Sequence, residues 1–445
     1  MPGVPDAWYN IRPDLGFELP EDLPSPLRAS GGINVQVPPA LVRQELSGRR
    51  FLPIPQEVVE RYRQWRPTPL RRAHTFERAV RSRCRIYYKY EGGNISGSHK
   101  LNTAVAQAFY YKAAGARCLT VGTGAGQWGT AVAAACAMFD LSCRVYMVRS
   151  SYLAKPYRKT IMELLGATVL PSPSERTAIG RASGARDGAG GSLSIAIAEA
   201  LEDTQKPGTY FCTGSGETYA LLHQTVIGLE AMDELAAMGE TADVVIASLG
   251  AGSNFGGLAL PFLRESLRGG RGVRCVAVEP AACPKLTRGR YAYDFTDASR
   301  LAPLQKMYTL GYRFVPPELH AGGLRYHGCA KLVSALYDRG MIEAAAYPQR
   351  AVFESAVLFA TAEGILPAPE SAHAVHGARI DARASDARGE SRCILIGVSG
   401  HGLLDMTAYE SYNDGTLIDA IAGDDQIEDS LALLPQTRDL IGAQR

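Results

Sequence analysis

The chain has no long hydrophobic run. The longest, residues 131–139, is far shorter than the ~20 apolar residues that a membrane-spanning helix needs. Residues 1–27 are polar and proline-rich, with no basic segment leading into an apolar one, so we expect no signal peptide. These two absences predict a soluble protein of the cytoplasm.

The nine cysteines form no CxxC pair and no other metal-ligand spacing. An odd number of cysteines without a signal peptide indicates reduced thiols, so we expect neither a disulfide framework nor a metal centre. We interpret all nine as small residues of the core.

A strong charge of either sign is also missing, since the formal net charge is only +2. The one local basic cluster, "RSRCR" at 81–85, is typical of a solvated surface, and we do not expect a nucleic-acid partner. The 445 residues, 46% of them hydrophobic and 21% charged, describe a globular protein with two lobes around a cleft.

Apolar segments with strand character alternate with helical segments from about residue 84 onward. "CLTVGT" precedes an alanine-rich helix, "SCRVYMVR" precedes another, and "ADVVIASLG" is a buried strand that ends in glycines. This alternation predicts an α/β fold with mostly parallel sheets and helices on both faces, in two three-layer αβα lobes. We expect the polar segment 379–392 to be an exposed connection.

Two glycine-rich turns and one lysine stand where strands pass into helices, the place where open parallel sheets bind ligands. "LGAGSNF" (249–255) and "GTGAGQWG" (122–129) let backbone N–H groups surround an anion at the start of a helix. Neither turn has the dinucleotide or nucleoside-triphosphate spacing. In "SGSHKLN" (96–102), Lys100 begins a helix, where a lysine is usually solvated. Two anion turns with a lysine suit pyridoxal phosphate (PLP), which needs a lysine and a phosphate cradle, and a carboxylated substrate.

Longer stretches resemble the β subunit of tryptophan synthase, a fold-type II PLP enzyme, and most closely its second, stand-alone-type β subfamily. They follow one another over roughly residues 55–410. The stretches are "RPTPLRRA", "SGSHKLNTAVAQAFYYKAAG", "TGAGQWG", "KPYRK", "SPSERTAIGR", "GSLSIAIAEA", "LLHQTVIGLEAM", "EPAACPKLTRGRYAYDF", "KMYTLGYRFVPPELHAGGLRYHG", "EGILPAPESAHA" and "SGHGLLD".

The resemblance implies a role for five single residues. Lys100 forms the internal aldimine and moves the substrate α-proton, and His99 lies at the cofactor phosphate. Asn102 bonds the phenolic oxygen, and Glu363 lies beside the cofactor ring. Ser399 faces the pyridine nitrogen and keeps it unprotonated, which favours β-elimination and replacement over transamination. Taken alone, Glu363 is equally typical of a helix end and Ser399 of a turn.

The same resemblance implies which ligand each of the two glycine-rich turns binds. The phosphate is cradled by Gly250, Ala251, Gly252, Ser253 and Asn254. The substrate carboxylate is held by Thr123, Gly124, Ala125, Gly126 and Gln127. Family members usually carry glycine at position 251, and alanine there costs ~1 kcal/mol if its φ is positive.

At two positions the chain departs from the family in its chemistry. Gly122 stands where the family has a glutamate that protonates the leaving hydroxyl of serine and then handles indole. Such general acid–base help is worth about 10²–10⁴ in rate. In "GSGETYALLHQ" (214–224), Glu217 replaces an uncharged residue on the wall of the second-substrate pocket. It is either a relocated acid–base group, a contact to a basic or hydroxylated nucleophile, or a helix-start carboxylate favoured by the dipole.

These features predict a PLP-dependent β-replacement enzyme that forms an aminoacrylate from serine or an activated serine and adds a nucleophile. With Gly122, we expect a better leaving group than hydroxide or a nucleophile other than indole. The alternatives are tryptophan synthase activity itself, with Glu217 or water substituting, a β-eliminating lyase or dehydratase, and a silent partner of an active β subunit. The retained lysine and cofactor residues argue against the last of these.

The resemblance further implies a homodimer and a monovalent cation (Na⁺ or K⁺) near the cofactor, and it leaves an α subunit undetermined. It divides the chain into five segments, the third of which contains a closing subdomain at about 115–214. The segments are an N-terminal arm and helix (1–65), a strand segment given to the C-terminal lobe (66–98), the N-terminal lobe (99–227), the phosphate-binding C-terminal lobe (228–420) and a tail (421–445).

Overall fold

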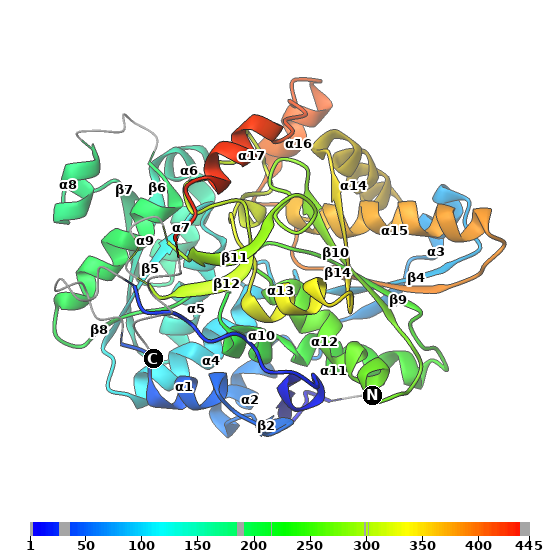
Figure 1. The fold of residues 1–445 in the computed structure, drawn as a ribbon, viewed down its shortest axis with the longest axis horizontal. Helices are drawn as coiled ribbons and strands as arrows, with labels where there is room; N and C mark the ends of the chain where they lie inside the picture. Colours follow the sequence, from blue (N-terminus) through cyan, green and yellow to red (C-terminus); the bar gives the residue numbers. More distant parts are fainter. Residues whose placement is uncertain are drawn as a thin grey trace.

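The computed structural model describes residues 3–25, 36–184, 191–214, 216–297, 300 and 302–436 of the chain. Across these ranges strands and helices alternate, and the strands form two mainly parallel sheets. Figure 1 shows the smaller sheet at the left and the larger one at the centre and right. The predicted α/β class is confirmed. No helix within the described ranges is long and apolar enough to cross a bilayer.

The larger sheet has six strands in the order β13-β10-β9-β14-β4-β3. Neighbouring strands run parallel except for β3, which pairs antiparallel with β4. The strands are β3 (Leu70–Arg72), β4 (Arg85–Tyr90), β9 (Val244–Ser248), β10 (Arg274–Pro280), β13 (Glu343–Tyr347) and β14 (Cys393–Val398).

Helices cover both faces of this sheet because the side chains of its inner strands alternate between two apolar layers. On one side Val245 belongs to the same buried cluster as Leu258 of α12 (Ser253–Leu267). On the other side its neighbour Ile246 is buried with Val375 of α15 (Pro369–Ala387). The segment 379–392 was predicted to be an exposed connection, and this is wrong up to residue 387, because α15 buries one face of it.

The smaller sheet has four parallel strands in the order β7-β6-β5-β8. Its central strands contact α5 and α9, and α7 contacts β7. The elements of this unit are β5 (Cys118–Thr123), α5 (Gln127–Met138), β6 (Ser142–Val148), α6 (Arg149–Ala154), α7 (Pro156–Leu164), β7 (Ala167–Ser172), α8 (Ala178–Gly184), α9 (Leu193–Glu202), η3 (Asp203–Gln205) and β8 (Thr209–Phe211).

The remaining described elements connect and surround the two sheets, with an antiparallel β1–β2 pair and an antiparallel β11–β12 pair among them. The N-terminal segments run along the lower side in Figure 1. These elements are β1 (Ala7–Tyr9), η1 (Arg12–Asp14), α1 (Pro39–Glu45), β2 (Phe51–Pro53), α2 (Gln56–Tyr62), α3 (His74–Val80), α4 (Lys100–Ala113), α10 (Thr218–Gln224), α11 (Val226–Ala237), β11 (Arg290–Phe295), β12 (Leu304–Thr309), η4 (Gly322–Leu324), α13 (Lys331–Asp338), α14 (Gln349–Glu363), α16 (Met406–Asn413) and α17 (Asp424–Leu431).

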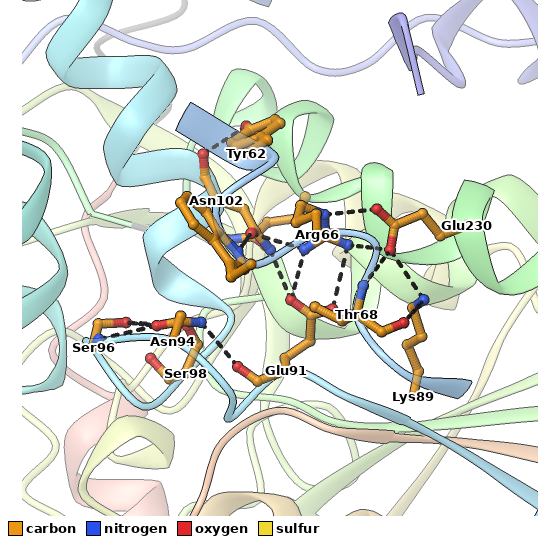
Figure 2. Close-up of polar contacts among 12 residues, drawn as sticks. Tyr62, Arg66, Thr68, Lys89, Glu91, Asn94, Ser96, Ser98, Asn102 and Glu230 are labelled. Atoms are coloured by element: carbon orange, nitrogen blue, oxygen red, sulfur yellow. Dashed lines mark hydrogen bonds and ion pairs between the residues drawn. The ribbon is translucent and has the colours of Figure 1, made fainter. Parts of the chain in front are cut away.

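A buried network of charges joins β4, α4 and α11 (Figure 2). The Arg66 guanidinium lies 2.9 Å from a carboxylate oxygen of Glu91 and 2.9 Å from one of Glu230. Lys89 Nζ lies 3.0 Å from Glu230. Burial by itself raises the pKa of Glu91, but Arg66, Lys89 and a hydrogen bond from Thr68 together outweigh it and lower that pKa to about 2. Glu91 is therefore ionised in the folded protein at neutral pH.

Close backbone packing explains why residue 122 is glycine. Gly122 is near the end of β5, and a Cβ placed on it would lie 2.6 Å from the backbone nitrogen of Ile197 in α9. No real Cβ approaches a backbone atom so closely, so any side chain at this position forces α9 away from the sheet. Two residues later the space is open, since a Cβ on Gly124 would have no neighbouring atom within 4 Å.

We expect Arg66→Met to lower the free energy of unfolding by about 3–5 kcal/mol, because two buried carboxylates lose their guanidinium. Urea denaturation measures the change. Arg83→Met is the matched control, since Arg83 pairs with Asp386 at 3.6 Å and its side chain is 64% exposed. Equal destabilisation by the two variants would contradict the dominant role of the buried network.

We expect Gly122→Ala to cost about 1–3 kcal/mol of stability, because α9 must shift to admit the methyl group. The Tm and the urea midpoint measure this cost, and Gly124→Ala is the control with open space for its methyl group. A Gly122→Ala variant as stable as Gly124→Ala would show that α9 does not restrict this position.

Candidate functional site

Two adjoining cavities meet at Lys100, the first residue of α4. The larger has a volume of about 860 Å³, and the smaller lies over the start of α12. Both are lined by Lys100, Gln127, Ala251 and Gly323. The carboxyl ends of β5, β9 and β14 and the first turns of α5 and α12 meet here, as expected for a ligand site of a parallel sheet.

The smaller cavity is built around the turn between β9 and α12. It is lined by all five residues predicted to cradle a phosphate: Gly250, Ala251, Gly252, Ser253 and Asn254. A Cβ on Gly250 would lie 2.3 Å from the carbonyl oxygen of Gly323, and Gly252 has a φ of 134°. The side chain of Asn254 is held by Ser248, at 3.0 Å from its carbonyl oxygen. Residue 251 is not among the residues with positive φ, so alanine is tolerated there.

His99 and Lys100 lie together at the edge of this cradle, as the sequence predicts. Burial lowers the pKa of the Lys100 amine, and the nearby Glu370 carboxylate opposes that shift only in part. Burial also lowers the pKa of His99 to about 3, which leaves its imidazole neutral. A desolvated lysine is the form that attacks a carbonyl group, so its environment suits covalent catalysis.

Glu363, predicted to lie beside the cofactor ring, is not in either cavity. It is the last residue of α14, and its Oε1 accepts hydrogen bonds from the backbone N–H groups of Thr75 (3.0 Å) and Phe76 (2.8 Å) at the start of α3. The carboxylate that lies beside Lys100 is Glu370, which is 7% exposed. Its Oε1 accepts from the N–H of Gly323 at 2.8 Å, and no described residue bonds its Oε2.

A pattern in the sequence could have identified Glu370. Lys100, Gln127 and Ser253 all occupy the first position of a helix, and these helix starts face the cavities. Glu370 is in the first turn of α15, next to Pro369, a residue favoured at helix starts. Glu363 and Glu370 both lie in "EGILPAPESAHA", but only Glu370 stands at the start of a helix. The pattern of helix starts therefore identifies Glu370 and not Glu363.

Asn102 also lies outside the cavities, contrary to the prediction that it bonds the cofactor. Its carbonyl oxygen accepts from Arg66 at 2.9 Å, and its amide nitrogen donates to Glu91 and Gln224, each at 3.0 Å (Figure 2). Two residues along a helix from Lys100, the Asn102 side chain leaves the helix on another face and enters the buried network. Its role in the structure is to hold the first turn of α4.

The orphaned polar atoms of the smaller cavity fit PLP. Ser98 Oγ, His99 Nδ1 and Glu370 Oε2 are buried and have no partner among the described residues. Ser399 lines the cavity too, and its hydroxyl lies 2.8 Å from that of Ser371. A phosphorylated, polar aromatic aldehyde offers acceptors to the cradle and to Ser399, together with a carbonyl carbon for Lys100.

The turn predicted to hold the substrate carboxylate faces the larger cavity with four of its five residues: Thr123, Gly124, Ala125 and Gln127. Gly126 does not line either cavity. It has a φ of 93° and turns the chain into α5, and a Cβ there would lie 3.1 Å from Arg158. Gly126 therefore has a conformational role, which only glycine fills without strain.

Glu217 lines the far part of the larger cavity, at the start of α10. Its side chain does not cap that helix. Burial raises the pKa of Glu217 to about 7, the Glu45 and Asp22 carboxylates act in the same direction, and Lys331 opposes them. A carboxyl group with this pKa both donates and accepts protons near neutral pH.

The wall next to Gly122 is apolar. Leu193, Ile197 and Leu201 of α9 line the larger cavity beside it, together with Phe211. Helix α9 occupies the space beside Gly122, so no side chain projects into the cavity from this position. The carboxylates among the described lining residues of this cavity come from other segments, Glu217 among them.

The sequence profile of the family described as "Pyridoxal-phosphate dependent enzyme" matches residues 62–400. The chain is 51% identical over 430 residues to "Tryptophan synthase beta chain 2" of Aeropyrum pernix, which covers 94% of each chain. It is 49% identical over 422 residues to the protein of that name from Methanosarcina acetivorans (93% of this chain, 95% of the other). The Thermotoga maritima protein of that name is 49% identical over 411 residues (91% and 97%). The chain therefore belongs to the family of pyridoxal-phosphate-dependent enzymes and is a β-replacement enzyme of the tryptophan synthase β type.

Proposed function

We propose that this enzyme replaces the β-substituent of an activated serine, such as an O-acyl or O-phospho serine, with a nucleophile other than indole. The observation that carries the proposal is Gly122 with the backbone of α9 packed against it. A carboxylate cannot reach the β-carbon from this position. The family's usual proton donor to a leaving hydroxyl is worth about 10²–10⁴ in rate, and acetate or phosphate leaves without it.

The residues of the smaller cavity hold the cofactor in this proposal. Backbone N–H groups of 250–254 bind the phosphate, Ser399 faces the pyridine nitrogen, and Lys100 binds the aldehyde carbon. When bound, PLP supplies the electron sink that makes the substrate α-proton acidic and lets the β-substituent leave. Lys100 Nζ moves that α-proton, and burial favours its role as a base by lowering the pKa of the amine.

The turn formed by Thr123, Gly124, Ala125 and Gln127 orients the amino acid by its carboxylate in the larger cavity. The start of α5 favours an anion there through the helix dipole. Glu370 beside Lys100 orients the cofactor ring and its substrate through the Oε2 that no described residue bonds. We include Glu370 in the catalytic set in place of Glu363.

Further parts of the proposal rest on the resemblance. They are a homodimer, a monovalent cation near the cofactor and a closing movement of residues of about 115–214 over the substrate. An ion pair crosses from α7 to the loop after β14, since Arg158 lies 2.8 Å from Asp405. This pair supports a closed arrangement of the smaller-sheet unit.

Tryptophan synthesis from serine and indole is the second candidate, because Glu217 offers a titrating carboxyl group in the same cavity. The two functions differ in their dependence on the leaving group. A proton-donating Glu217 serves a hydroxide leaving group, whereas an activated serine needs no donor.

We expect O-acetylserine or O-phosphoserine to be consumed with a kcat/KM at least about 10²-fold above that of serine by the purified holoenzyme. Rapid-scanning absorbance follows the cofactor band, and mass spectrometry identifies the products. Release of keto acid and ammonia without a nucleophile would indicate a lyase. Tryptophan formation from serine and indole at the rate of a typical tryptophan synthase would overturn the proposal.

We expect Glu370→Gln to lower kcat by about 10²-fold while its stability stays close to wild type, because the amide oxygen of the new glutamine still accepts the bond from Gly323. Glu363→Gln is the matched variant. It weakens the cap of α3 and costs about 0.5–2 kcal/mol of stability, with kcat unchanged. Steady-state kinetics and thermal denaturation of both proteins measure this, and reversed effects would restore the role first predicted for Glu363.

A further inference from the structure

The far part of the larger cavity has more carboxylates than cations. Asp22 and Glu45 both pair with Lys331, whose Nζ lies 3.1 Å from Asp22 Oδ1 and 3.4 Å from Glu45 Oε1. Glu217 is close enough to both carboxylates and to Lys331 for their charges to act on it. In the described part of the chain, the ammonium group of Lys331 therefore pairs with two of these carboxylates and acts on the third through its charge.

The described lining of the whole cavity has the same imbalance. Its acidic residues are Glu18, Glu21, Asp22, Glu45, Glu217 and Asp297. Its basic residues are Arg12, Lys100 and Lys331. The proposed function assigns Lys100 to the cofactor. Among the described lining residues, and with Asp297 left out, two basic side chains then remain against five acidic ones. Low-dielectric walls strengthen the resulting negative potential, which attracts cationic ligands and repels anionic ones.

The carboxylate of Glu217 has no structural duty that accounts for its place in the cavity. The N–H groups at the start of α10 are served by Glu45, whose Oε2 accepts from Tyr219 N at 2.9 Å, and the Glu217 side chain does not cap the helix. Gln305, which also lines the cavity, stabilises the ionised form of Glu217. The Glu217 carboxylate thus faces the cavity with a hydrogen bond to Gln305, and it has two oxygens with which to accept further bonds from a ligand.

A second observation indicates that a polar ligand completes this cavity. Trp128 lines it and is 9% exposed, and its indole Nε1 has no hydrogen-bond partner among the described residues. A buried donor left unpaired costs about 1–3 kcal/mol, which a ligand with an acceptor atom recovers. Glu45 Oε1 is likewise without a hydrogen bond and has only its ion pair with Lys331.

We propose that the second substrate is a nucleophile carrying a positively charged ammonium group, and that Glu217 is the residue that selects it. The inference rests on the proposed function and names the class of its nucleophile. The ammonium group binds between Glu217 and the Asp22–Glu45 pair, and the carbon skeleton contacts the apolar side chains of α9. Binding of the cation relieves the repulsion among the three carboxylates.

Matched thiols test the charge of the nucleophile. The probes are ω-aminoalkanethiols of two to six carbons, with ω-hydroxyalkanethiols and ω-mercaptocarboxylates of equal length. O-Acetylserine is the first substrate of the holoenzyme. In each turnover the thiol sulfur bonds to the β-carbon, the C–O bond to acetate breaks with its electron pair, and the thiol proton leaves with the acetate. Mass spectrometry of the S-alkylcysteine products gives kcat/KM for each probe.

We expect the aminoalkanethiols to exceed the hydroxyalkanethiols by at least about tenfold in kcat/KM and the carboxylates to be the poorest, through KM. Glu217→Gln should remove most of that preference. Glu265→Gln, a change at an exposed carboxylate outside the cavity, should leave it intact. Equal values for the three charge types, or a preference that survives Glu217→Gln, would overturn the inference while leaving the proposed function standing.

The pH dependence of wild type supplies a test without a variant. Near pH 7 Glu217 takes up a proton, so the ratio of kcat/KM for amine over alcohol should fall from pH 8 to pH 6. The groups that face Glu217 are Asp22, Glu45, Lys331 and Gln305, and burial raises the pKa of the nearby phenols of Tyr219 and Tyr326. A ratio that does not change with pH would count against Glu217.

If no thiol yields an S-alkylcysteine product, the proposed function is overturned. Calorimetry then tests the ammonium subsite separately from catalysis. The probe is 5-amino-1-pentanol titrated into the wild-type and Glu217→Gln holoenzymes, with 1,5-pentanediol as the neutral control. The ammonium subsite is supported if the affinity for the amine is at least about tenfold weaker in Glu217→Gln than in the wild type. Equal binding of amine and diol to both proteins excludes it.

Discussion

Buried charged side chains are joined through Asn102 to the first turn of α4, and the position of Lys100 depends on them. Arg66, Glu91 and Glu230 are fully buried, and Asn102 connects them to the helix that begins with Lys100. Separating any of these charges leaves another unpaired in a low-dielectric interior, so their arrangement is nearly all-or-none. The end of β4, the start of α4 and helix α11 are thereby held in fixed positions relative to one another. This arrangement in turn positions Lys100 relative to the two glycine-rich turns that line the same cavities.

Close backbone approach is the second constraint on the site, and it separates cofactor chemistry from substrate chemistry. Glycine at 250 and 252 admits the carbonyl oxygen of Gly323 and a left-handed turn, which leaves backbone amides to face a phosphate. Glycine at 122 admits α9 instead, and this packing excludes a side chain at that position. The turn at 250–254 thus keeps its close backbone packing, while the cavity wall beside Gly122 is hydrocarbon. Charge enters the cavity from elsewhere, through Glu217, Asp22 and Glu45.

Local pattern was a good guide wherever the chemistry is carried by the backbone. The alternation of strands and helices, the anion turns at 122–129 and 249–255, and the helix start at Lys100 could all be predicted because sterics and hydrogen bonding specify them within a few residues. Side-chain direction was harder to predict. Asn102 is two positions from Lys100 but points into the charge network, and Glu363 and Glu370 are seven positions apart in one motif yet serve different parts of the molecule. The polar segment after residue 379 continues α15 because packing of one face outweighs its overall polarity.

The sequence by itself determined the fold class and the cofactor class, because both depend on residue types at short and fixed spacings. Only the tertiary structure decided which carboxylates face the reacting groups. Glu370, Glu217, Glu45 and Asp22 come from four separate segments, and their proximity follows from how those segments pack. Electrostatic interactions act through space over several ångströms, and burial strengthens these interactions. A charged group that is distant in sequence therefore influences the site as strongly as a sequence neighbour does.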